Sequence, residues 1–136
     1  SSSVVVQGER ILTGVDSSIE IIFPSSESAK ISSSSQVEII QSLPNKIVFE
    51  HILGSITYIN QNEQPLSIRA KRLLVTVASG SAVISYDDAK DIVMIQNRDG
   101  KVKLAYNNVS LVSQVIELPT GKTAVFNNSR RKLTVR

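Results

Sequence analysis

The chain has 136 residues, which is enough for one domain with a buried core and too few for two. Apolar residues make up 41% of the chain, and because Val, Ile and Leu dominate them, the composition favours β-structure. The chain contains no cysteine, which excludes disulfides, cysteine-bound zinc and thiol catalysis.

The formal net charge of +3 is concentrated at the C-terminus. Residues 130–136 contribute four positive charges, whereas residues 1–129 contain 11 basic and 12 acidic side chains. Nucleic-acid-binding domains usually spread basic residues over one face and place aromatic residues among them. This chain has only three Tyr, three Phe and no Trp, with no such series. A nucleic-acid partner is therefore not expected.

The N-terminal third shows the residue alternation of β-strands. Apolar and polar residues alternate over residues 19–23, and Pro24 ends that run because proline cannot donate to a strand ladder. The serine-rich stretch 25–35 contains Ala29 and Ile31 at strand spacing. We therefore interpret this stretch as a polar-faced strand or a tight turn, and not as a flexible linker.

The middle of the chain continues this pattern. A turn is predicted at residues 43–45, and apolar strands are predicted around residues 47–59. Residues 60–65 form the clearest predicted loop. Residues 66–84 contain two predicted strands, broken at Ser79-Gly80-Ser81.

The last third contains a predicted hairpin. Asn97-Arg98-Asp99-Gly100 joins two apolar runs, and Asp-Gly is typical of a type I′ turn with positive φ. Val102, Leu104 and Tyr106 alternate after it, and two further strands are predicted at 115–118 and 123–126. No window has the period of an amphipathic helix. The sequence predicts about a dozen short strands and almost no helix.

Glycines mark a near-repeat along these strands. Gly54, Gly80, Gly100 and Gly121 each follow an apolar β-type run, with gaps of 26, 20 and 21 residues. With Gly14, we predict that they occupy structural turns. Such a spacing is typical of stacked hairpins or of β-solenoid rungs. The predicted fold is a single all-β, solenoid-like twisted stack of short antiparallel strands and hairpins.

Several glycine-containing segments occur in a definite order between Gly8 and Phe126. The first, Gly8-Glu9-Arg10-Ile11-Leu12-Thr13-Gly14 followed by Ser17, has the pattern G-x-x-I-x-T-G-x-x-S, and the others are residues 48–56, 77–83, 99–102 and 118–122. This order resembles the FecR domain, the extracytoplasmic part of bacterial ferric-dicitrate-type signalling regulators. The resemblance implies a β-solenoid-like stack outside the cytoplasm that binds other proteins.

Two polar features are candidates for a catalytic or metal site: His51 and the cluster of Asp87, Asp88 and Asp91. His51 is the only histidine and lies within an apolar strand, where it occupies either the solvent face or a satisfied polar niche. A catalytic base would need a positioned nucleophile and an orienting group. Asp87, Asp88 and Asp91 lack the glycine of a typical calcium loop and surround Lys90, so they indicate a solvated turn. We expect no catalytic residues, no metal site and no cofactor.

The basic C-terminus is the candidate binding segment. We divide the chain into a FecR-like β domain at residues 1–129 and a basic tail at residues 130–136. The tail is interpreted either as a frayed terminus or as a docking segment for an acidic partner or an anionic membrane surface. Its candidate partner-binding residues are Arg130, Arg131, Lys132 and Arg136.

We therefore expect a non-enzymatic interaction module in the periplasm or elsewhere outside the bacterial cytoplasm, acting in envelope signalling or assembly. Its expected partners are other envelope or membrane proteins, or a second copy of the chain. No stretch approaches the roughly 20 apolar residues of a membrane span. The alternative is a structural subunit that stacks through its open β edges into a ring, a filament or a larger envelope complex.

Overall fold

The structure, a computed structural model, describes residues 7–43 and 46–136 and contains no helix in these ranges. The twelve strands are β1 (Arg10–Leu12), β2 (Ile19–Ile22), β3 (Ser28–Ile31), β4 (Gln36–Leu43), β5 (Lys46–Asn60), β6 (Leu66–Ala70), β7 (Leu73–Asp87), β8 (Ile92–Asn97), β9 (Lys101–Asn107), β10 (Ser113–Leu118), β11 (Thr123–Asn127) and β12 (Lys132–Val135). The all-β prediction is confirmed, and β3 confirms a strand within the serine-rich stretch. The turn predicted at residues 43–45 falls partly outside the described residues.

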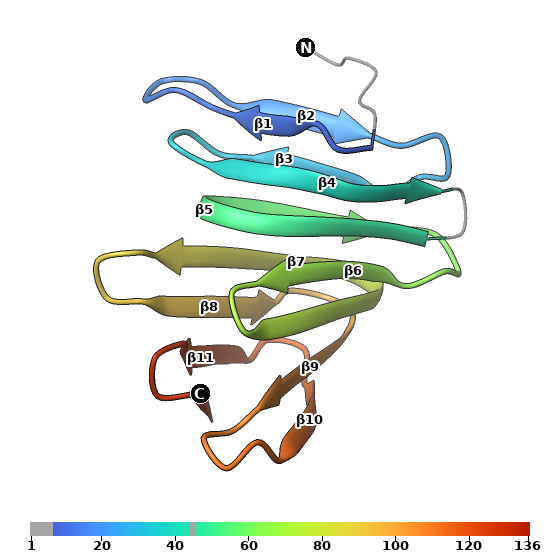
Figure 1. The fold of residues 1–136 in the computed structure, drawn as a ribbon. Helices are drawn as coiled ribbons and strands as arrows, with labels where there is room; N and C mark the ends of the chain where they lie inside the picture. The colour runs from blue at the N-terminus through green and yellow to red at the C-terminus, as the bar shows by residue number, and fades with distance from the viewer. Residues whose placement is uncertain (1–6, 44–45) are drawn as a thin grey trace.

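The strands form two sheets that share β5 and β7 (Figure 1). Sheet A has the order β1-β4-β5-β6-β7-β9-β10. Sheet B has the order β2-β3-β5-β7-β8-β11-β12. Only β5 and β6 pair in parallel; every other pairing of the described strands is antiparallel. Because both orders follow the chain, the fold is a stack with β1 and β2 at one end and β10 and β12 at the other.

The two longest strands pass from one sheet to the other at a glycine. Residues of β5 up to Leu53 pair in sheet A, and those from Gly54 onward pair in sheet B. In β7 the same change occurs at Gly80. Their φ angles are +81° and +83°, which favour glycine. The sequence had suggested that these two glycines lie in turns between separate strands. They lie instead within continuous strands, at the points where those strands bend.

The hairpin predicted at residues 97–100 is wrong. The two strands that flank it, β8 and β9, do not pair with each other; β8 pairs with the sheet B half of β7, and β9 with the sheet A half. The segment is a corner between sheets, and Gly100 does not have positive φ. Gly100 is instead required by crowding, because a Cβ atom there would lie 2.8 Å from the Cα of Gly80.

The other two glycines that were predicted to lie in turns, Gly121 and Gly14, differ in backbone conformation. Gly121 has a φ of +83° in the turn between β10 and β11. Gly14 does not have positive φ, and the nearest atom to a Cβ there would be the Ser17 Oγ at 3.7 Å. The backbone at position 14 therefore does not require glycine.

The core lies between the two sheets. The predicted alternation is confirmed where Ile21 and Phe23 are buried and Ile22 is exposed, and where Val102 and Leu104 are buried. Each of these strands presents one face to the opposite sheet, because side chains alternate along a strand. The largest fully buried side chains include Tyr58, Phe49, Phe126, Ile21 and Ile31.

Buried amides complete the hydrogen bonding where the chain turns at the rim of the sheets. The Asn97 side-chain amide donates to the carbonyl oxygens of Gly100 and Leu118, both at 2.8 Å, and its oxygen accepts the Gly100 N–H at 3.0 Å. Asn60 donates to the carbonyl oxygens of Gln64 and Val77, both at 2.8 Å. These contacts matter because an unpaired buried carbonyl or amide is costly. The two amides thus stabilise the chain where it leaves β8 and β5.

Candidate protein-binding surface

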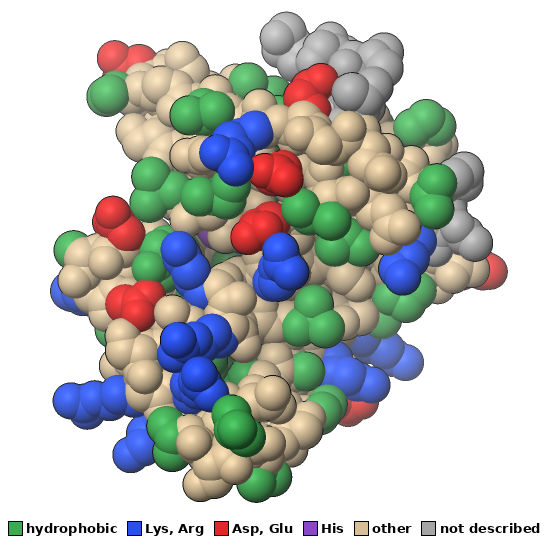
Figure 2. All heavy atoms as spheres, in the orientation of Figure 1, with side chains coloured by type: hydrophobic (Ala, Val, Ile, Leu, Met, Phe, Trp, Pro, Cys, Tyr) green, Lys and Arg blue, Asp and Glu red, His purple; other side chains and the backbone are tan. Residues whose placement is uncertain are grey.

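Charge is distributed unevenly along the stack. Residues 65–136 contain twelve Lys and Arg against five Asp and Glu, whereas residues 1–64 contain three against seven. Since stack order follows chain order, the end bearing β10 and β12 is basic, and the end bearing β1 and β2 is acidic. Blue side chains accordingly predominate in the lower half of the space-filling view (Figure 2). The basic character belongs to the whole C-terminal half and not to the tail alone.

The predicted basic tail is partly built into the sheet. Lys132–Val135 form β12, which pairs with β11 from Ala124 to Asn127, and the side chain of Leu133 packs against the core. Arg136 also exchanges two backbone hydrogen bonds with Thr123, at 2.8 and 2.9 Å. Residues 132–136 are therefore the edge of sheet B and not a frayed terminus.

The loop before β12 is held against two other turns. The Arg72 N–H donates to the Asn128 Oδ1 at 3.0 Å, and the Arg72 guanidinium donates to the Asn128 carbonyl at 3.4 Å. The Asp91 carboxylate accepts from the Asn128 amide at 3.2 Å and from the Ser129 hydroxyl at 2.6 Å. These contacts place the loop that carries Arg130 and Arg131 against the turn that carries Lys71 and Arg72.

Asp91 anchors this group of turns. It also accepts a hydrogen bond from the Tyr86 hydroxyl at 2.6 Å, and the Lys71 ammonium lies 4.7 Å from the centre of the Tyr86 ring. Hydrogen bonds from Ser129, Tyr86 and Asn128, aided by the charge of Lys71, lower the pKa of Asp91. Burial and the neighbouring Asp91 carboxylate raise the pKa of Tyr86 to about 12. Asp91 is a structural acceptor, whereas the turn had been expected to be simply solvated.

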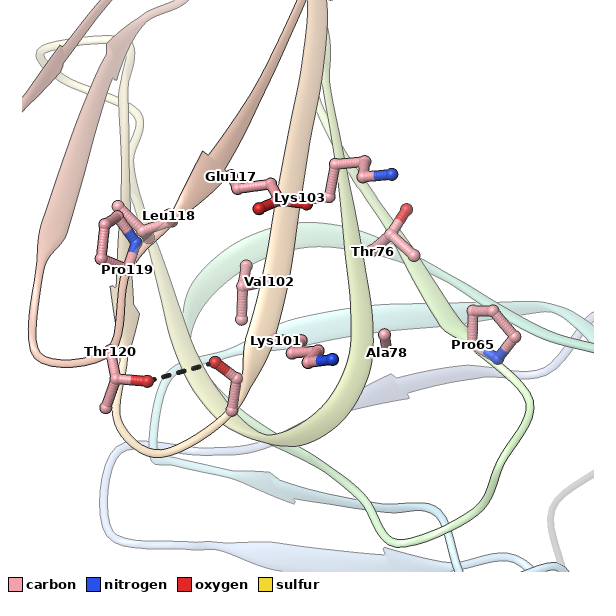
Figure 3. Close-up of a pocket in the computed structure, with 11 residues that line it drawn as sticks. Pro65, Thr76, Ala78, Lys101, Val102, Lys103, Glu117, Leu118, Pro119 and Thr120 are labelled. Carbon is pink, nitrogen blue, oxygen red and sulfur yellow. Dashed lines mark hydrogen bonds between the residues drawn. The ribbon is translucent and has the colours of Figure 1, made fainter.

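Two hollows occur on sheet A in the basic half. The larger, of about 580 Å³, lies over β7, β9 and β10 and includes Thr76, Lys101, Lys103 and Glu117 in its lining (Figure 3). At its margin the Thr120 hydroxyl donates to the Gly100 carbonyl at 3.3 Å. The smaller, of about 350 Å³, is lined by residues that include Lys71, Arg72 and Leu74.

Most cations of this surface lack a carboxylate partner. In residues 7–43 and 46–136, ion pairs within 4.0 Å are limited to Arg10–Glu38 at 2.9 Å and Arg69–Glu50 at 2.8 Å. Arg72, Lys101, Arg130 and Arg131 therefore form no ion pair within this distance. Neither do Lys71, whose charge acts on Asp91, and Lys103, which lies opposite Glu117. Such a surface attracts acidic partners over about one Debye length, roughly 8 Å at physiological salt.

Sequence reasoning found the cations of residues 130–136, which are adjacent in the chain, and missed Lys71, Arg72, Lys101 and Lys103. Counting charge separately in the two halves of the chain would have revealed the second group.

His51 lies far from solvent in a polar niche, where its Nδ1 accepts from the Tyr58 hydroxyl at 2.9 Å and its Nε2 donates to the Gly54 carbonyl at 2.7 Å. This location matches the second of the two environments predicted for it.

Removing residues 130–136 should destabilise the domain. The deletion removes β12, leaves β11 as an open edge and uncovers part of the core near Phe126, whose ring lies 5.1 Å from that of Tyr106. We expect a loss of about 2–3 kcal/mol from lost backbone pairing and apolar burial. Thermal denaturation followed by circular dichroism measures it.

The control for this truncation retains β12 and replaces the four cations of residues 130–136 by glutamine. Exposed surface substitutions of this kind usually change stability by about 0.5 kcal/mol or less. Equal melting temperatures for the truncated and intact chains would contradict a structural role for β12.

Taken together, these features define an all-β domain whose two sheets share two strands and whose C-terminal half carries a basic, hollowed surface. No protein-family model matches the chain, and no curated protein matches it. Two crystal structures from Parabacteroides distasonis, each described as a "putative anti-sigma factor", have similar folds, with TM-scores of 0.76 and 0.77 at 14% and 13% sequence identity.

Each of these similarities covers 94% of this chain and 59% of the other one. This chain therefore spans less than two thirds of the proteins that it resembles in structure. At this level of identity the similarity establishes the fold. No helix among the described residues is long and apolar enough to cross a membrane.

Proposed function

We propose that the chain is a FecR-like, non-enzymatic protein-binding domain of an anti-sigma-type regulator, located outside the bacterial cytoplasm. The observation that carries this proposal is the fold similarity, over 94% of the chain, to two crystal structures described as a "putative anti-sigma factor". The order of glycine-containing segments from Gly8 to Phe126 supports it independently, because it resembles that of FecR domains.

The physical features of the domain suit recognition of another protein. Twelve strands in two sheets give a rigid support, and the core holds no polar group that needs a ligand, since every buried side-chain N or O atom of the described residues has a hydrogen-bond partner. The polar chemistry available to a partner is on the surface, in the cations of the basic half that form no ion pair within 4.0 Å. In this proposal, a protein arriving at that surface changes how the regulator controls its sigma factor.

The test is a chromosomal deletion of the codons for residues 7–136 within the full-length gene of the source bacterium, followed by transcript sequencing. We expect a several-fold change in a discrete set of genes that share one promoter type. A matched strain carrying Gly14→Ala, at a position where the backbone does not require glycine, should retain the parental transcript levels.

Transcript levels that are unaltered by the deletion would argue against a signalling role.

A second experiment tests the location of the domain. It measures whether protease added to spheroplasts can reach the domain, with a cytoplasmic protein as the protected control. Protection of the domain from protease would contradict the proposed extracytoplasmic location.

A second candidate function is a subunit that stacks end to end. The opposite charges of the two ends of the stack favour this alternative, because copies placed head to tail would bring an acidic end against a basic one. Sedimentation velocity at several protein and salt concentrations separates the candidates. Growth in mass with concentration that weakens at high salt supports stacking, and a constant monomer supports the signalling module.

A further inference from the structure

In the part of the chain that the structure describes, the two sheets have four edge strands, and three of these are short. Short strands, lysine and proline are common means of blocking an edge. Strand β1 has three residues, and β2 has four and is followed closely by Pro24. Strand β12 also has four residues and begins at Lys132.

Strand β10 is longer than these three, and Pro119 follows it directly. It has six residues, contains neither lysine nor proline, and pairs with β9 over its whole length without a register shift. Its other side has no partner among the described residues. It is therefore the longest open edge of the described fold, with a row of backbone donors and acceptors available for another strand.

The surroundings of β10 are apolar. Val115 is 58% exposed on the outer face of β10, and the loop that leads into β10 exposes Val109, Leu111 and Val112 by 69%, 73% and 54%. Isolated exposed apolar residues are ordinary, but four within seven residues at one open edge form a patch. A patch of this kind favours an occupant with apolar side chains.

The neighbouring charges are basic. Lys101 and Lys103 lie on β9, the strand next to β10, and line the 580 Å³ hollow together with Thr76 and Thr120. Glu117 on β10 lies directly opposite Lys103 in the pairing and is the one carboxylate in the hollow's lining. Because the lining has two lysines and one carboxylate, it favours acidic residues in an occupant, except at the position beside Glu117.

We propose that β10 binds an extended, acidic segment of a partner protein, which adds as a further strand to sheet A. The partner's backbone pairs with the open edge, an apolar side chain contacts Val115, and an acidic side chain beyond the position of Glu117 approaches Lys101, because Lys103 and Lys101 both lie toward the Leu118 end of the pairing. Strand addition takes its affinity from main-chain hydrogen bonds and its specificity from alternate side chains. This proposal rests on the protein-binding role proposed above and specifies the chemistry of the partner.

The test uses a synthetic peptide with a central Val-Thr-Val-Ile-Val run flanked on each side by Asp-Glu-Asp. Fluorescence anisotropy measures its binding to the 136-residue chain, and amide hydrogen exchange of the chain locates the residues that it covers. We expect slower exchange at residues 113–118 and weaker binding at high salt, because exposed charges are screened. A peptide with Lys in place of each acidic residue should bind on the order of tenfold more weakly.

Two substitutions and two matched controls test the surface itself. Val115→Lys places a charge on the edge and should weaken binding on the order of tenfold, and Lys101→Glu should weaken it and reduce its salt dependence. Met94→Lys and Lys30→Glu make the same chemical changes at exposed positions on sheet B and should leave binding unchanged.

Several outcomes would overturn the proposal. These are equal binding by the Val115→Lys variant, exchange protection at another edge, equal binding of the basic peptide, or the absence of peptide binding at millimolar concentration. Self-association of the chain that Val115→Lys abolishes would assign the edge to a second copy and also overturn it. The transcript experiment reports on signalling alone. Unaltered transcript levels together with intact peptide binding would therefore reject the signalling role and retain the binding site at β10.

Discussion

Substitution of Gly80 by valine should cost the domain about 4 kcal/mol or more, among the largest effects of a single substitution. The φ angle of Gly80 is +83°, which a β-branched residue adopts only with strain. A Cβ atom at this position would also lie 2.6 Å from the Cα of Gly100 and 2.8 Å from the carbonyl carbon of Asp99. Both obstacles are backbone, so neither can be relieved by a side-chain rotation.

The measurement is thermal or urea denaturation followed by circular dichroism. A loss of this size should lower the melting temperature by roughly 15 °C in a domain of this length. Gly121→Val is the matched control, because Gly121 has the same φ of +83° with no atom within 4 Å of a Cβ, so only backbone strain of about 1–2 kcal/mol is expected. Equal losses for the two variants would show that the contact between Gly80 and Gly100 does not matter.

The strands of this fold were predictable from the sequence because they depend on local alternation. Val102 and Leu104 are buried and Lys103 is exposed, as period-two alternation requires. The path of the chain between the sheets was not predictable in this way. A glycine between two apolar runs has the same appearance in a turn as in a bent continuous strand, and only pairing partners distant in sequence distinguish them. Gly54 and Gly80 were misplaced for this reason.

The candidate surface was found in part for a related reason. Arg130 and Arg131 are adjacent in the chain, and their charge is evident in the sequence. Lys71 and Arg72 join them only because the Arg72 N–H bonds to Asn128, 56 positions further along. The open edge at β10 also depends on the fold, since no residue in it signals which strand lacks a neighbour.

The largest expected pH effect originates at His51, which is buried beside the bend of β5. Its Nε2 must carry the proton, because the Gly54 carbonyl at 2.7 Å can only accept. Its Nδ1 then accepts from the Tyr58 hydroxyl at 2.9 Å. The neutral ring is thus fully hydrogen-bonded, and a second proton on Nδ1 would reverse the hydrogen bond with Tyr58 and take from the Tyr58 O–H the acceptor that it has in the neutral state. Burial lowers the pKa of His51 to about 4, against a smaller opposing effect of the Gly54 hydrogen bond.

Acidification from pH 6.5 to pH 4 should therefore destabilise the fold. In this window the unfolded chain, with an ordinary histidine pKa of 6.5, binds a proton that the folded chain does not. The stability that neutral His51 contributes is fully present above pH 6.5 and falls by about 3 kcal/mol as the pH approaches 4. Asp91, whose pKa is lowered from 3.8, contributes a loss only at lower pH. Urea denaturation across this range measures the effect, and His51→Gln, which can retain both hydrogen bonds without titrating, should flatten it. An identical slope in that variant would assign the pH dependence to other groups.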